Sequence, residues 1–230
     1  MNRNPFQRSY RRFINARHEF RDFQVRSISE IEDICDSIDR FKQLENMFSA
    51  YVSNNDDDQV QLWFGNRSMF RKLQTGAVAT ECGPCLLYTL GDSGDVAVVL
   101  YPARSDLGKV KEDHLYLGLG YFTSYQLMKR LKSDIRALTA YGHVTSFDGD
   151  PSFFEKFVIW WLRQTRDMQQ AGSYMKSPVK RFVFSTIRNA PQTLFGYILA
   201  AVLGAVVIAM LIKYFNHSGW NNIAALLGNN

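Results

Sequence analysis

Apolar residues recur at helical spacing through the N-terminal part of the chain. In residues 3–26 aromatic residues alternate with seven arginines, which predicts a basic amphipathic helix. A second helix is predicted over residues 29–51, because Ser29 and Glu32 match a capping box and begin a regular apolar stripe. The stripe consists of Ile31, Ile34, Ile38, Phe41, Leu44 and Phe48. Residues 1–58 are therefore expected to form a helical arm with a basic and an acidic half.

From residue 59 onward, polar and apolar residues alternate in the way that is typical of β-strands. A turn is predicted at residues 65–68, and Gly91-Asp92-Ser93-Gly94 is a hairpin signature. Residues 75–80 are a weaker strand candidate. The main predicted strands are residues 59–64, 69–73, 85–90, 95–101 and 114–119. The expected core is a small antiparallel sheet of four or five strands.

Helical spacing returns after the predicted strands. Thr123 and Gln126 form a capping pair, and Gly142 is expected to end this helix. Its apolar face consists of Leu127, Leu131, Ile135 and Leu138. Together with the sheet, the helix predicts an α+β domain over residues 59–175, in which helices flank the strands.

A further helix is predicted after Ser152, which forms a capping pair with Glu155. The helix is unusually rich in large apolar side chains, namely Phe153, Phe154, Phe157, Val158, Trp160 and Trp161. It is either the central packing helix of the domain or a surface that meets other chains or lipid.

The longest apolar stretch lies near the carboxyl end. Residues 189–212 hold 24 residues without a charged side chain. At about 1.5 Å per helical residue this length spans the roughly 30 Å hydrocarbon layer of a bilayer. We therefore expect one C-terminal transmembrane helix at residues 191–215, after a basic juxtamembrane joint at residues 176–190 and before a short tail at residues 216–230.

The distribution of charge orients this helix. The net charge is +5, and all 22 acidic residues precede the apolar stretch, together with every Lys and Arg except Lys213. By the positive-inside rule, the N-terminal domain is expected in the cytoplasm, and the protein in the inner (cytoplasmic) membrane as a single-pass protein. No apolar segment opens the sequence, so insertion is expected to depend on the late helix. Three cysteines do not suggest a disulfide framework.

Small residues on the predicted transmembrane helix favour self-association. They recur every four positions along two neighbouring ridges, which are Gly196, Ala200 and Gly204, and Ala201, Ala205 and Ala209. Such ridges let helices approach closely in lipid, where no hydrophobic effect drives them together. Two ridges on each helix are compatible with a homo-oligomer, including a closed ring.

Two basic clusters are candidate anion-binding surfaces. One is Lys129, Arg130, Lys132 and Arg136 on the predicted third helix, and the other includes Arg11 and Arg12 in the arm. Each is either a solvated helix face or a surface that binds an anionic ligand, such as a nucleotide or oligonucleotide, or a membrane.

Residues 82–85 read Cys-Gly-Pro-Cys, which resembles the redox motif of thioredoxin-like proteins. In that family a helix follows the motif and activates the first thiol, whereas here a Gly-rich turn begins six residues after Cys85. The stretch around Cys82 also resembles papain-like peptidases that process bacteriocin leaders. That resemblance implies Cys82 as nucleophile, His114 or His143 as base, Asp148 or Asp150 as the residue that orients the base, and Gln74 as oxyanion donor.

No phosphate-binding loop or metal-ligand cluster is present in the sequence, so neither a cofactor nor a metal site is expected. The layout, with a likeness around residues 95–105, resembles the small membrane effectors of prokaryotic antiphage systems of the Hailong and cyclic-oligonucleotide types. The resemblance implies an oligomeric ion channel in antiviral defence, whose cytoplasmic domain senses an anionic signal made by a partner enzyme. The alternative is a tail-anchored cysteine peptidase or thiol enzyme that uses Cys82.

Overall fold

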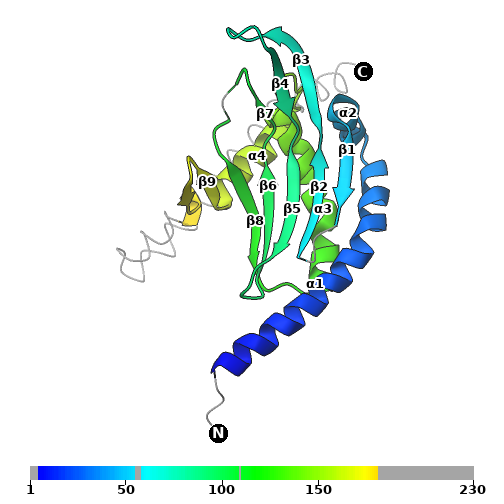
Figure 1. Cartoon of the computed structure of the whole chain (residues 1–230), viewed down its shortest axis with the longest axis vertical. Coiled ribbons are helices and arrows are strands. Elements are labelled where there is room, and N and C mark those ends of the chain that lie inside the picture. The colour runs from blue at the N-terminus through cyan, green and yellow to red at the C-terminus, as the bar shows by residue number, and fades with distance from the viewer. Residues whose placement is uncertain (1–4, 55–57, 109, 181–230) are drawn as a thin grey trace, which may run out of the picture. The chain divides into compact units, whose positions relative to one another are not determined.

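The computed structural model describes residues 5–54, 58–108 and 110–180 (Figure 1). The chain divides into two compact units, Met1–Pro178 and Val179–Asn230, and the first unit is described here. The predicted transmembrane helix, its two small-residue ridges and the tail lie outside the described residues. Within the described part of the chain, no helix has the length and apolar character needed to cross a membrane.

A seven-stranded antiparallel sheet forms the centre of the first unit, with the strand order β1-β2-β5-β6-β8-β9-β10. Its strands are β1 (Ala50–Ser53), β2 (Gln59–Phe64), β5 (Cys85–Leu90), β6 (Val96–Tyr101), β8 (His114–Gly120), β9 (Met168–Gln170) and β10 (Ser173–Met175). The α+β class and the antiparallel order are confirmed, but the sheet is larger than predicted. The strands added to this sheet, β1, β9 and β10, have three or four residues and are too short to carry a readable alternation.

A second sheet contains β3 (Asn66–Lys72), β4 (Val78–Cys82) and β7 (Arg104–Ser105). The predicted turn at residues 65–68 is wrong, because the chain passes from β2 into β3 without reversing and changes sheets at Gly65. The returning pair β4 and β5 changes sheets beside it, where the Gly83 N–H donates to the Gly65 carbonyl at 3.0 Å. The chain reverses instead at residues 73–77, at the tip of the β3–β4 hairpin.

The N-terminal arm is one long helix followed by a short one, α1 (Pro5–Asp36) and α2 (Asp39–Phe48). The predicted helix start at Ser29 is wrong, because Ser29 lies exposed within α1 and the helix breaks only at residues 37–38. Phe20, Phe23, Ile31 and Ile34 are buried in the core of the first unit. The arm is therefore part of the same compact unit as the sheet.

Two of the three predicted capping pairs are present, at the starts of α3 (Ser124–Thr145) and α4 (Phe153–Thr165). Gly142 does not end α3. A Cβ at this position would lie 2.5 Å from Leu44 and 2.9 Å from Pro84, so glycine allows α2 and Pro84 to pack closely on the helix.

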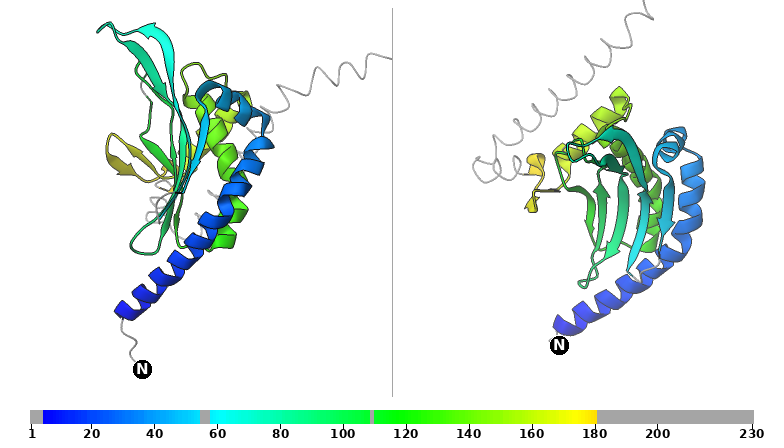
Figure 2. Two further views of the ribbon diagram at one scale, coloured as in Figure 1. Left: turned by 45° about the vertical axis from the view of Figure 1, so that its right-hand side comes forward. Right: turned by 45° about the horizontal axis from the view of Figure 1, so that its top comes forward.

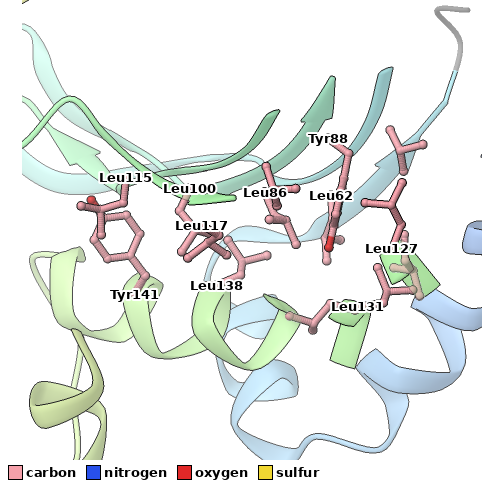
Figure 3. Close-up of a cluster of buried hydrophobic side chains, with 14 of the residues drawn as sticks. Leu62, Leu86, Tyr88, Leu100, Leu115, Leu117, Leu127, Leu131, Leu138 and Tyr141 are labelled. Atoms are coloured by element: carbon pink, nitrogen blue, oxygen red, sulfur yellow. The ribbon is translucent and has the colours of Figure 1, made fainter. Parts of the chain in front are cut away.

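The helices cover one face of the large sheet (Figure 2, left). Inward-pointing residues of four strands meet α3 in a dry core, drawn in Figure 3 with Leu62, Leu86, Leu100 and Leu115 above Leu131. Buried Tyr88 donates to Asp134 at 2.8 Å, and Arg130 pairs with the same carboxylate. Every polar group of this buried trio therefore has a partner.

Candidate functional site

Among the described residues, no helix covers the opposite face of the seven-stranded sheet (Figure 2, left). The strand registers place alternate residues of each strand on this side. We call this surface the open face. It consists of Tyr51, Ser53, Gln59, Gln61, Trp63, Cys85, Leu87, Thr89, Ala97, Val99, Tyr101, His114, Tyr116, Leu119, Gln169 and Tyr174.

Aromatic rings run across the open face from one edge of the sheet to the other. Tyr51 stacks on Trp63 with 4.7 Å between ring centroids. In the strand register, Cys85 lies between Trp63 and Tyr101. The ring centroid of Tyr101 lies 5.1 Å from that of His114. Further contacts of 4.9 Å and 5.9 Å connect His114 to Tyr116 and Tyr116 to Tyr174. The rings thus form two mutually supported groups, which are separated by Cys85 in the middle of the sheet.

None of the sixteen open-face residues is Asp, Glu, Lys or Arg. Leu119 and Tyr174 are nevertheless 65% and 53% exposed. Solvent-facing strands of an antiparallel sheet usually carry polar or charged residues, so an uncharged and ring-rich face of this extent is typical of a surface that meets another apolar surface. It lacks the cations that would hold a phosphate.

Burial favours the neutral forms of three side chains on the open face. Burial lowers the pKa of His114. The charge of Asp113 acts in the opposite direction, and that of Arg104 lowers the pKa further. Burial also raises the pKa of Tyr101, and raises that of the Cys85 thiol to about 11. At neutral pH the surface therefore carries no formal charge.

The catalytic arrangement suggested by the peptidase resemblance is not assembled in the structure. Cys82 ends β4, whereas Gln74 lies at the tip of the β3–β4 hairpin beyond Val78. At about 3.3 Å per strand residue, the four steps from Val78 to Cys82 alone separate them by about 13 Å. His114 lies in the other sheet, next to Tyr101 on the open face.

The other proposed base and its acids have structural partners. His143 is buried, and its Nε2 lies 3.0 Å from the Arg40 carbonyl, which requires a proton on that nitrogen. Asp148 accepts a hydrogen bond from Arg67 at 2.8 Å. The carbonyl of Asp150 accepts one from Arg40 at 2.7 Å.

The Cys-Gly-Pro-Cys sequence has a structural role, because it carries the chain from the small sheet to the large one. A Cβ on Gly83 would lie 2.4 Å from the Cβ of Phe64, and Pro84 is buried against Gly142. The motif thus occurs here without the helix that activates a thioredoxin thiol.

This role gives a prediction about stability. Gly83→Ala is expected to lower the unfolding free energy by about 1–3 kcal/mol, since two packed strands must separate to admit the methyl group. Cys82→Ser, at an exposed position, is expected to change it by less than about 0.5 kcal/mol. Thermal and urea unfolding of the two full-length variants would check this, and a larger loss in Cys82→Ser would contradict it.

The predicted anion-binding cations fall into two groups. Arg130 is half-buried and pairs with Asp134, and Arg12 pairs with Asp95, so both stabilise the fold. Lys129, Lys132 and Arg136 are exposed along one stripe of α3, and Arg11 is exposed on α1.

The sequence reasoning missed the open face, although the signal for it was present. The segments of β2, β5, β6 and β8 alternate as half-buried strands do, yet neither of their two faces contains an Asp, Glu, Lys or Arg. The described residues contain no cluster of His, Cys, Asp and Glu that could hold a metal ion. No protein-family model, curated protein or solved structure matches this chain.

Proposed function

We propose that the protein is a membrane-anchored effector that acts as a homo-oligomer, and that its first units associate through their open faces. The observation that carries this proposal is the uncharged, ring-rich surface across the sheet. In a two-fold contact the same patch meets itself, so a patch with charges of one sign would repel its copy. The open face avoids this penalty.

The size of the surface suits a protein partner. Seven strands about 4.8 Å apart and about 20 Å long in the centre give a flat area of roughly 600 Å². This is of the same order as the roughly 800 Å² that each partner contributes to a standard protein interface.

Anchoring would strengthen a weak contact of this kind. The uncharged residues 189–212 have the length and composition of a membrane span, and their small-residue ridges suit close helix packing. Molecules confined to one membrane meet at a raised effective concentration. The two associations would therefore support each other.

In this proposal the oligomer controls ion flow through the membrane and responds to an anionic signal. The exposed stripe of Lys129, Lys132 and Arg136 is the surface of α3 that suits a nucleotide or oligonucleotide, because each cation points to solvent. A role in antiphage defence follows from the likeness of the layout to small membrane effectors.

Two measurements test the proposed function. After induction in bacteria, the protein is expected to remain in the membrane through a carbonate wash and to cause ion leak, detected by uptake of a membrane-impermeant dye. Cys82→Ser is expected to leave the leak unchanged. Release of the protein by carbonate, or loss of the leak in Cys82→Ser, would contradict the proposal.

Acid is expected to weaken the association through His114. Because folding lowers its pKa below the ordinary value of 6.5, stability linked to neutral His114 is present above that value and lost as the pH falls through the lowered pKa. Protonation would put a cation among Tyr101 and Tyr116, with Arg104 and Asp113 nearby.

Sedimentation of the detergent-solubilised protein between neutral pH and about pH 5 measures this effect. The oligomer is expected to dissociate on acidification, and His114→Gln is expected to reduce that response. Equal pH responses in the two proteins would show that another group is responsible.

A further inference from the structure

Helix α4 turns its aromatic side chains away from the core. Only Glu155 and Ile159 of this helix are buried. At 100° per residue, the five aromatic residues fall in one stripe about 120° wide, roughly opposite those two. The stripe consists of Phe153, Phe154, Phe157, Trp160 and Trp161. The prediction of a central packing helix is therefore wrong, whereas contact of this surface with other chains or lipid stays a prediction.

An ion pair fixes this orientation. Arg40 of α2 donates to both carboxylate oxygens of Glu155, at 3.0 and 2.7 Å. Burial alone would raise the pKa of Glu155, but the bonds from Arg40 and Ser152 outweigh it and lower the pKa. The charged residue thus faces inward with its partners, and the rings face outward.

The outward face is substantially exposed. Phe153 and Phe154 are 57% and 71% exposed, and Trp160 and Trp161 are 50% and 42% exposed. Contacts of 5.9 and 6.4 Å between ring centroids link Phe157, Trp160 and Trp161 into one patch. Exposed tryptophan and phenylalanine in such number on one helix mark an interaction surface.

Most of the exposed charges near the patch are positive. Lys156 on α4, Arg166 at its carboxyl end and Lys176 beyond β10 are all exposed. The two acids between residues 151 and 178 are engaged within the fold. Glu155 pairs with Arg40, and Asp167 accepts hydrogen bonds from Tyr174 and Ser177. Asp150, directly before α4, is also exposed. The rings are thus bordered mainly by cations, which suits the headgroup layer of an anionic bilayer.

We propose that the aromatic stripe of α4 inserts into the headgroup layer of an anionic membrane. This inference rests on the proposed membrane anchoring. The interval from Lys180 to the uncharged stretch at residue 189 is short enough to keep the first unit near the bilayer, since nine residues extend at most about 30 Å. The stripe then sets which side of the first unit faces the lipid, because its apolar side chains insert as those of an amphipathic interfacial helix do.

A fluorescent probe on the stripe tests the proposal in the full-length protein. Phe154→Cys is labelled with an environment-sensitive dye in a Cys82→Ser background. The remaining thiols, Cys35 and Cys85, react slowly at neutral pH because burial raises their pKa values to about 12 and about 11. The protein is reconstituted into vesicles of phosphatidylcholine and phosphatidylglycerol, with spin labels on a fraction of the lipids.

A matched control comes from Tyr125→Cys on α3, because Tyr125 is 72% exposed against 71% for Phe154. Its position lies about 30 Å along α3 from the end nearest α4. Quenching by labelled lipid is expected to be at least about threefold stronger at position 154 than at position 125. Replacing phosphatidylglycerol with phosphatidylcholine is expected to reduce it.

Equal quenching at the two positions would overturn the proposal. So would a shielded probe at position 154 that lipid does not quench, since that outcome would mean that protein covers the stripe. Failure of the anchoring itself appears separately, as release of unlabelled protein from vesicles by carbonate.

Discussion

Arg67→Ala is expected to remove about 3–5 kcal/mol of unfolding free energy, because it strands a buried carboxylate. Glu81 is completely buried at the junction between the two sheets. Its oxygens accept from Arg67 Nε at 2.8 Å and from the backbone N–H of Phe147 at 2.7 Å. Without the Arg67 guanidinium, no cation contacts the buried Glu81 carboxylate.

Urea unfolding of the full-length protein in detergent measures this loss. The control is Arg71→Ala, which removes an exposed arginine of the same strand and is expected to cost less than about 1 kcal/mol. Arg67→Met combined with Glu81→Gln is expected to recover part of the stability, because the buried charge is removed together with its partner. A loss below about 1 kcal/mol in Arg67→Ala would contradict this account of the junction.

Leu119→Lys is expected to weaken self-association by about 100-fold or more. Leu119 lies on the open face and is 65% exposed, so lysine at this position is compatible with the folded unit. In a two-fold contact each copy contributes the new charge, and like charges brought together in an interface cost several kcal/mol. Tyr125→Lys changes the charge equally on α3 and is the matched control.

Subunit exchange between differently labelled copies in detergent, followed by energy transfer, measures this effect. Exchange is expected to speed up strongly in Leu119→Lys and to stay unchanged in Tyr125→Lys. Equal exchange rates in the two variants would place the contact elsewhere.

The elements with strong local signals were predictable. Strands β2 and β5 match the predicted segments residue for residue, and the capping residues Thr123 and Ser152 begin α3 and α4 as expected. These signals come from residues close together in the sequence, so long-range packing does not change the elements that they predict. The helix break was predicted at the wrong position. Ser29 is a residue type that often caps helices, but α1 continues through it without interruption.

The orientation of elements was harder to predict than their existence. The composition of α4 suggests a core helix, but the long-range pair between Arg40 and Glu155 turns its rings outward. Likewise, Gly65 was predicted in a turn and Gly83 belongs to a sequence that resembles a redox motif, but both mark where strands change sheets. Such choices depend on partners far apart in sequence, which periodicity does not contain.

The candidate site, too, was predictable from the sequence only in part. The sequence contains the uncharged strands, but only the register aligns Tyr51, Trp63 and Tyr101 into a row across the sheet. It also presents two clusters with six candidate cations, of which the fold engages Arg12 and Arg130 in ion pairs within the unit.

The mass of the full-length protein in detergent tests the central claim most directly. One chain has a mass of 26.5 kDa. For the unaltered protein we expect a multiple of this mass, which falls toward the mass of a single chain on dilution. For Leu119→Lys we expect the single-chain mass without dilution. A single-chain mass at every concentration, or a Leu119→Lys assembly as large and as stable as the original, would contradict it.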